Sequence, residues 1–114
     1  NRMGKPIVLS EFGLNRDQGA YDPASGTTAR DAFYRAIYDR VLARAKAGDA
    51  IAGSNFWAWG GRGRTANADW MWTTGDPFTG DPPQEAQGLF SLFDSDASTL
   101  KIVSDHAAAM QALP

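Results

Sequence analysis

The chain has 114 residues and a formal net charge of −2, with 11 Lys and Arg residues against 13 Asp and Glu residues. This length allows one domain at most, and the interspersed charges give no electrostatic indication of binding to nucleic acid or to a membrane surface. No cysteine is present, which excludes disulfide bonds and thiolate chemistry. The longest apolar stretches are far shorter than the roughly 18 residues that a membrane-spanning helix needs. The first six residues do not form a signal-peptide pattern, so we expect any targeting signal to lie upstream.

The stretch Gly-Lys-Pro-Ile-Val-Leu-Ser-Glu-Phe-Gly, residues 4–13, predicts a buried strand that ends in a carboxylate. Ile7, Val8 and Leu9 form an unbroken apolar run, which favours a strand covered on both faces, as in a parallel sheet. Glu11 then lies at the carboxyl end of that strand. Ligands and catalytic groups gather at this edge in parallel α/β architectures, so Glu11 is the first candidate site residue. The alternative is a solvated or helix-capping carboxylate.

A loop rich in Gly, Asp, Asn and Pro separates this strand from a predicted helix that begins near Thr28. Thr28 and Asp31 fit a capping box, and Gly48 is expected to end the helix. Apolar residues recur on one side of the helix, namely Phe33, Ile37, Val41 and Ala45, with Tyr34, Tyr38 and Leu42 widening the stripe.

A second strand is predicted over residues 51–59, Ile-Ala-Gly-Ser-Asn-Phe-Trp-Ala-Trp. The loop that follows reaches from 60 to about 88, and loops of that length inside compact domains are usually functional. The apolar run at 89–93 does not favour one state. A final helix is predicted from Thr99 to Ala112, with an apolar face made of Leu100, Val103, Ala107, Met110 and Leu113.

The order strand, helix, strand, long loop, helix predicts two parallel strands joined by a right-handed crossover. Two parallel strands alone leave open edges and an apolar face without cover. We therefore expect either further strands from sequence outside these residues or self-association of several copies.

Three stretches, residues 5–13, 55–61 and 79–100, together resemble a known family. They read Lys-Pro-Ile-Val-Leu-Ser-Glu-Phe-Gly, then Asn-Phe-Trp-Ala-Trp-Gly-Gly, then a stretch beginning Thr-Gly-Asp-Pro-Pro-Gln-Glu-Ala-Gln-Gly. They are similar to the C-terminal end of glycoside hydrolase family 5 endo-β-1,4-mannanases, which are secreted (β/α)8-barrel enzymes. The resemblance runs from about residue 4 to the end and makes the two predicted strands the seventh and eighth of the barrel.

The resemblance implies an α/β fold in which residues 1–114 are the C-terminal portion of a glycosidase TIM barrel, incomplete as a domain. It implies hydrolysis of β-mannan or a related polysaccharide, and an extracellular or periplasmic location. We expect no nucleic-acid or membrane partner, no cofactor and no metal site. The lone His106 has no partner pattern for a metal and is expected on the surface of the final helix.

The resemblance also implies roles for single residues. Glu11 matches the catalytic nucleophile on strand seven, and Trp57 best matches the aromatic platform for the sugar on strand eight, with Trp59 as the second candidate. The family's acid/base Glu lies on strand four and has no counterpart here. Retaining hydrolysis needs two carboxyl groups about 5 to 5.5 Å apart, so we expect these residues to be inactive alone.

Two further candidates come from the residues themselves. Asn55 alternates with Trp57 and Trp59 and is a candidate for the barrel mouth. Arg16 either contacts outer sugar hydroxyls or forms a surface ion pair with Asp17. Two rival functions stay open, a cellulase-type retaining endo-glucanase and a noncatalytic carbohydrate-binding fragment, although the Gly-Asp-Pro-Pro-Gln-Glu-Ala-Gln-Gly stretch favours mannan.

Overall fold

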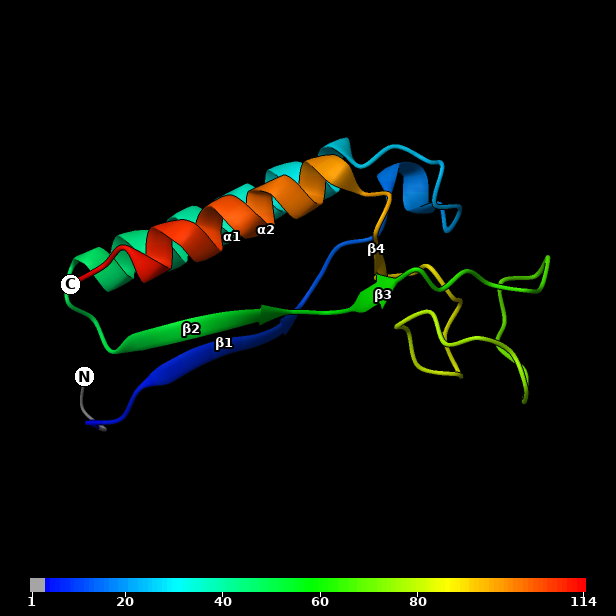
Figure 1. The fold of residues 1–114 in the computed structure, drawn as a ribbon, viewed down its shortest axis with the longest axis horizontal. Coiled ribbons are helices and arrows are strands. Elements are labelled where there is room, and N and C mark those ends of the chain that lie inside the picture. Colours follow the sequence, from blue (N-terminus) through cyan, green and yellow to red (C-terminus); the bar gives the residue numbers. More distant parts are fainter. Residues whose placement is uncertain (1–3) are drawn as a thin grey trace.

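The computed structural model of the protein describes residues 4–114, which form two layers. Strands β1 (Ile7–Phe12) and β2 (Ile51–Phe56) form one layer, and helices α1 (Thr28–Lys46) and α2 (Ala97–Gln111) run side by side over one of its faces (Figure 1). Both helices run against the direction of the strands. The arrangement is that of two successive strand-helix units. Neither helix within these residues has the length and apolar character that crossing a membrane requires.

A region of loops extends beyond the carboxyl ends of β1 and β2 (Figure 1). It contains the 3-10 turn η1 (Asp17–Gly19) and two short strands, β3 (Trp59–Gly61) and β4 (Leu92–Phe93), which pair in parallel. Residues 62–91 contain no helix or strand, which confirms the predicted long loop. The apolar run whose state the sequence left open supplies β4.

Strands β1 and β2 pair in parallel, as predicted. Leu9 lies opposite Ser54, and Phe12 lies opposite Phe56, so β1 uses one more residue than β2 between these pairs. Glu11 lies in this irregular stretch, and its φ of +58° is in the left-handed region that side chains other than glycine seldom adopt. The carboxylate therefore stands at a local distortion of the strand.

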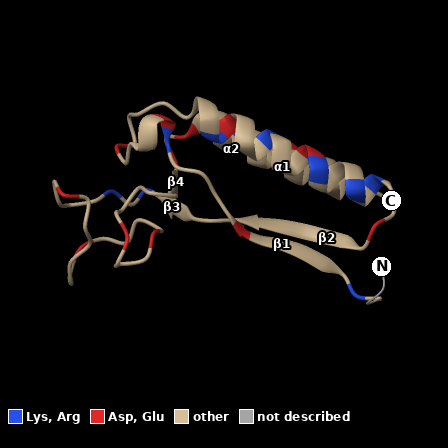
Figure 2. Cartoon of the chain, turned by 180° about the vertical axis from the view of Figure 1, so that it is seen from behind, with Lys and Arg blue, Asp and Glu red and all other residues tan. Residues whose placement is uncertain are grey.

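One face of the sheet has no cover. The helices lie over the other face, and the apolar side chains of Ile7, Val8 and Leu9 are 46%, 50% and 37% exposed. The prediction that the first strand is covered on both faces is therefore wrong for residues 4–114, while the expected open apolar face is confirmed. Figure 2 shows charged residues of both signs along the helices but few along the strands.

The core lies between the helices and the covered face of the sheet. Tyr34, Tyr38 and Ile102 are buried there, and the ring of Phe12 lies 5.6 Å from each tyrosine ring. Phe56 reaches the same cluster from β2. Burial raises the pKa of Tyr38 to about 12 and also raises the pKa of Tyr34. An aromatic cluster thus joins both strands to both helices.

The predicted apolar faces of the helices are partly wrong. On α1 the two tyrosines are buried, whereas Phe33 and Ile37 stay partly exposed. On α2 Ile102, which the pattern omitted, is buried, and Ala107 is exposed. Helix α1 packs against both β2 and α2, whereas α2 packs mainly against α1. The buried residues of each helix therefore lie where it meets its neighbours and not along its most apolar row.

The predicted capping box at the start of α1 is also wrong. Thr27 precedes the helix and makes no side-chain cap. The carboxylate of Asp17 instead accepts hydrogen bonds from the N–H groups of Ala29 (2.8 Å) and Thr28 (2.9 Å), which lowers the pKa of Asp17. The loop after β1 is thereby fastened to α1. Gly48 follows the end of the helix with a φ of +79°, as predicted.

The strand predicted over residues 51–59 is divided. Strand β2 ends at Phe56, the peptide bond between Trp57 and Ala58 is cis, and β3 begins at Trp59. Strand β3 leaves the first sheet and pairs with β4. Trp57 and Trp59 therefore lie where the chain turns from the sheet into the loop region.

Candidate active site

Glu11 lies at the carboxyl end of β1 and is exposed. The next residue, Phe12, is anchored in the aromatic core, so the position of the Glu11 backbone is fixed from one side. No hydrogen bond or ion pair joins the Glu11 carboxylate to another residue of the described chain, 4–114. Backbone conformations of this kind persist where the surrounding structure imposes them and are frequent at functional sites. The carboxylate is therefore available to a ligand.

Trp57 lies beside Glu11 at the same edge of the sheet. Its backbone N–H donates a hydrogen bond of 2.8 Å to the carbonyl of Phe12, the residue that follows Glu11. Gly13 allows this approach, because a Cβ atom at that position would overlap the Trp57 carbonyl oxygen. The indole is 38% exposed, which leaves part of the ring open to contact. The structure thus brings together the two residues that the sequence placed at neighbouring strand ends.

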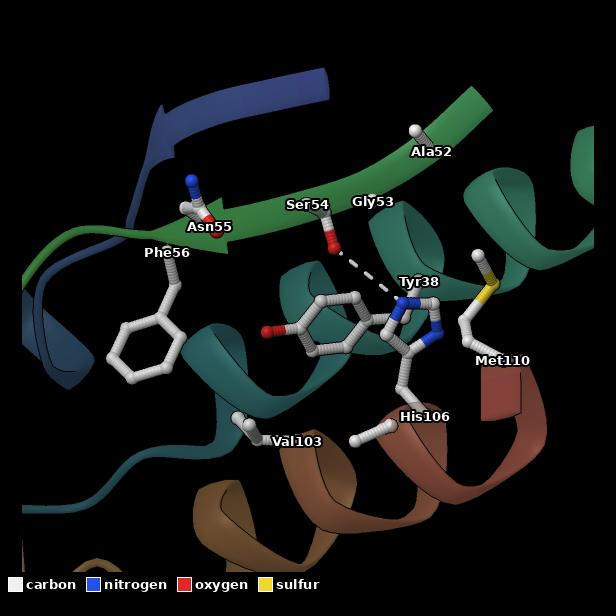
Figure 3. Close-up of a pocket in the computed structure, with 10 residues that line it drawn as sticks. Tyr38, Ala52, Gly53, Ser54, Asn55, Phe56, Val103, His106 and Met110 are labelled. Atoms are coloured by element: carbon white, nitrogen blue, oxygen red, sulfur yellow. Dashed lines mark hydrogen bonds between the residues drawn. The ribbon is translucent and has the colours of Figure 1, made fainter. Parts of the chain in front are cut away.

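Trp59 and Asn55, the other two candidates from this part of the chain, lie on different strands. Trp59 is on β3 and is 56% exposed, so it faces solvent beyond the sheet. Asn55 is exposed on β2 and points away from the helices, whereas Ser54 points toward them (Figure 3). The regular alternation predicted from Asn55 through Trp57 to Trp59 does not hold, because the strand ends at Phe56. Asn55 nonetheless lies on the face of the sheet opposite the helices.

Arg16 lies inside the protein and not at its surface. Its side chain is 1% exposed, and its Nη2 atom lies 2.6 and 2.8 Å from the carboxylate oxygens of Asp96. Its Nη1 atom donates to the carbonyl of Ser25. The predicted surface pair with Asp17 is therefore wrong, because Asp17 caps α1. Burial also removes the guanidinium from contact with sugar hydroxyls, so the structure contradicts a substrate-binding role for Arg16.

Asp96 forms the centre of a buried ion-pair network that the sequence did not reveal. Besides Arg16, it accepts hydrogen bonds from Nη1 of Arg30 (3.1 Å) and from the backbone N–H of Phe93 (2.9 Å). Burial, together with the charge of Arg16, lowers the pKa of Arg30. These contacts join the loop after β1, helix α1, strand β4 and the start of α2. Asp96 therefore joins the loop that follows Glu11 to β4 and to the start of α2.

A separate cavity of about 410 Å³ lies between β2 and the two helices (Figure 3). His106 lines it, with its ring stacked on Tyr38 at 4.1 Å and its Nε2 atom 3.4 Å from the Ser54 hydroxyl. The predicted surface position of His106 is therefore wrong, and burial lowers its pKa. Within residues 4–114 no three His, Cys, Asp or Glu side chains gather as a metal site. The cavity lies on the helix side of β2, and Asn55 borders it at the strand.

Two parallel strands with helices over one face, and a carboxylate and an indole at their carboxyl ends, are the arrangement of part of a (β/α)8 barrel. The complete chain, residues 1–114, matches the family described as "GH family 5 beta-mannosidase-like". The protein belongs to this family of glycoside hydrolases.

Solved structures and curated relatives agree with this assignment. A glycoside hydrolase family 5 mannosidase from Rhizomucor miehei matches with a TM-score of 0.83 and 32% identity, over 96% of this chain and 28% of that chain. A variant of that enzyme in complex with mannosyl-fructose matches with a TM-score of 0.82 and 31% identity, over 96% of this chain and 27% of that chain. The putative mannan endo-1,4-beta-mannosidase 4 of Arabidopsis thaliana is 32% identical over 96% of this chain and 22% of its own.

A putative mannan endo-1,4-beta-mannosidase 9 of Oryza sativa subsp. japonica is 42% identical over 48% of this chain and 12% of its own length. The matched part of the chain thus spans between 12% and 28% of the length of these relatives.

Replacing Asp96 tests the buried network. We expect Asp96→Asn to lower the free energy of unfolding by roughly 3 to 5 kcal/mol, because it leaves two buried guanidinium groups without a counter-charge. Urea denaturation measures this loss. Asp94→Asn is the matched control, since the Asp94 carboxylate pairs with Arg64 at the surface and its removal is expected to change little. Equal effects of the two substitutions would contradict a central role for Asp96.

Replacing Gly13 tests the close approach of the two strand ends. We expect Gly13→Ala to destabilise the protein by roughly 1 to 3 kcal/mol, because the added methyl group must push the Trp57 carbonyl away. Gly53→Ala, also in the paired region, is the control, because a Cβ atom there meets nothing within 4 Å. Thermal unfolding of the two variants side by side measures the difference, and an unchanged midpoint for Gly13→Ala would refute the steric argument.

Proposed function

We propose that these residues are the part of a retaining endo-β-1,4-mannanase that supplies the nucleophile, Glu11, and the sugar platform, Trp57. The observation that carries the proposal is the hydrogen bond between the Trp57 N–H and the Phe12 carbonyl, which sets the carboxylate and the indole at one edge of a parallel sheet. Membership of the family and the names of the matched relatives support the choice of mannan. The complete enzyme would act outside the cell or in the periplasm.

The chemistry assigned to Glu11 is attack on the anomeric carbon. The carboxylate forms a glycosyl-enzyme intermediate while a second carboxyl group protonates the leaving oxygen, and water then releases the sugar with retained configuration. A nucleophile of this kind must be ionised and accessible, and Glu11 is exposed without a partner among residues 4–114. The donors that hold it in the complete enzyme, and the second carboxyl group, would come from outside this chain.

The chemistry assigned to Trp57 is stacking. An indole face packs against the C–H bonds of a pyranose ring, while polar neighbours hold the hydroxyl groups. Asn55 and Trp59 are the neighbours within this chain that we propose for sugar contact. Both are exposed, and Asn55 lies on the face of β2 that the helices leave open.

Two other functions are distinguishable by experiment. A cellulase-type retaining endo-glucanase would share the chemistry of Glu11 and differ in the sugar it accepts, so turnover of cellulose in place of mannan by the full-length protein identifies it. A noncatalytic carbohydrate-binding fragment would hold the sugar on Trp57 without cleaving it. The matched relatives that are called mannan endo-1,4-beta-mannosidases favour mannan.

The role of Glu11 is testable in the full-length protein. We expect Glu11→Ala to lower kcat on mannan by roughly 10³-fold or more, since no other group can form the glycosyl-enzyme. Added azide should restore turnover and yield the α-mannosyl azide, because it attacks from the face that Glu11 occupied. Glu85→Gln, which changes the other glutamate of the chain, should retain activity. A β-mannosyl azide would show that Glu11 is the acid/base group, and unchanged activity would exclude it from the reaction.

The behaviour of the 114 residues alone is a second test. We expect no turnover of mannan, because the second carboxyl group is missing, and we expect self-association through the open apolar face of β1. A reducing-sugar assay and the mass in solution measure these two properties. Clear turnover would contradict the need for a carboxyl group from outside the chain, and a stable monomer would contradict association through β1.

A further inference from the structure

We propose that Asp81 is a positioning residue for Trp57, acting through the backbone of the loop that ends at β4. The inference rests on the proposed function, since it concerns the sugar platform. Asp81 belongs to the Gly-Asp-Pro-Pro-Gln-Glu-Ala-Gln-Gly stretch, which carried part of the family resemblance and has no place in a strand or a helix. The hydrogen bonds of its carboxylate give this stretch a structural role in the loop before β4.

The Asp81 carboxylate is fully engaged by the loop itself. One oxygen accepts the N–H of Phe90 at 2.9 Å, and the other accepts the N–H groups of Gly88 (2.8 Å) and Ser91 (3.2 Å) and the Ser91 hydroxyl (2.5 Å). Asp81 is 4% exposed and Ser91 is fully buried. A carboxylate so placed cannot contact a sugar or serve as an acid/base group. It instead holds the backbone from Gly88 to Ser91 in one conformation.

That backbone in turn holds the residue after Trp57. The N–H of Ala58 donates to the carbonyl of Phe90 at 3.2 Å, and the N–H of Leu92 donates to the carbonyl of Ala58 at 2.8 Å. Both polar groups of the Ala58 backbone are therefore bound to the two residues that flank Ser91. Ala58 and Leu92 are buried, so water does not compete for these hydrogen bonds.

Trp57 is consequently held between two supports. On one side its own N–H bonds to Phe12 of β1, and on the other side Ala58 bonds to the loop that Asp81 organises. Within residues 4–114 the indole makes no contact with another aromatic ring and no side-chain hydrogen bond, so its position depends on how its backbone is held. A loop that loosens around Asp81 should therefore move the platform relative to Glu11.

Asp76 provides a matched comparison within the same loop. Its carboxylate accepts hydrogen bonds from the N–H and hydroxyl of Thr73, at 2.8 and 2.9 Å, and from the amide of Asn67 at 2.6 Å. Like Asp81, it organises several donors. Its partners lie between residues 67 and 76 and do not reach Ala58, so its removal should loosen the loop without moving Trp57.

The test is a double-mutant cycle in the full-length protein, with activity on a manno-oligosaccharide as the readout. We expect Asp81→Asn to lower kcat/KM about tenfold when Trp57 is present and less than about twofold in a Trp57→Ala background, because the cycle isolates the part that acts through the indole. Asp76→Asn should lower kcat/KM by less than about twofold in either background. Equal losses from Asp81→Asn in both backgrounds would overturn the proposal.

Amide hydrogen exchange supplies a readout that needs no activity. The amides of Ala58 and Leu92 should exchange faster in Asp81→Asn than in Asp76→Asn or the unaltered protein. If the protein does not cleave mannan, the proposed function fails, and the exchange of Ala58 still decides whether Asp81 fixes this segment. Unchanged exchange at Ala58 in an active protein would instead overturn the role of Asp81 alone.

A milder substitution covers the case in which Asp81→Asn does not fold. Ser91→Ala removes one donor to the Asp81 carboxylate and the hydrogen bond from the Ser91 hydroxyl to the carbonyl of Thr79. We expect a loss of about twofold to threefold in kcat/KM that disappears in the Trp57→Ala background. A loss that persists there, or no loss with unchanged Ala58 exchange, would contradict the proposal.

Discussion

The hydrogen bond from the Trp57 amide to the Phe12 carbonyl is the interaction on which the candidate site depends. The parallel pairing of β1 and β2 ends at this bond, and beyond it the two chain segments separate into different loops. Trp57 donates this bond, and Glu11 directly precedes the residue that accepts it. Because backbone contacts fix both residues, neither side chain needs a partner of its own to be held in place. The carboxylate and the open part of the indole are thus left free for a ligand.

Two buried aspartates stabilise the loops around that hydrogen bond, and they do so by different means. Asp96 pairs with the guanidinium groups of both Arg16 and Arg30 and so joins the loop after β1 to both helices. Asp81 accepts backbone N–H groups and so shapes the loop before β4. A short carboxylate that accepts but never donates suits both tasks, since each site presents only donors. The two aspartates together hold the segments that follow Glu11 and Trp57.

The sequence was sufficient for features that depend on neighbouring residues, and insufficient for those that depend on distant ones. The two parallel strands, the ends of the helices to within a few residues, and the place of Glu11 at a strand end all follow from local patterns. Arg16 and Asp17 show the limit. They are adjacent and of opposite charge, which suggested a pair, yet Asp17 caps α1 and Arg16 binds Asp96, eighty residues away. No local pattern indicates a partner at that distance.

The loops and the sheet of this chain differ in how far they depend on the rest of a barrel. The carboxylates of Asp81 and Asp96 find their donors within residues 4–114, and both side chains are buried by these residues alone. The strand β1 is different, because Ile7, Val8 and Leu9 are apolar and each is more than a third exposed. Covering such side chains is favourable by roughly 25 cal/mol for each Å² of apolar surface removed from water. Further strands would therefore add apolar burial, while the backbone contacts that join the segments of Glu11 and Trp57 lie within this chain already.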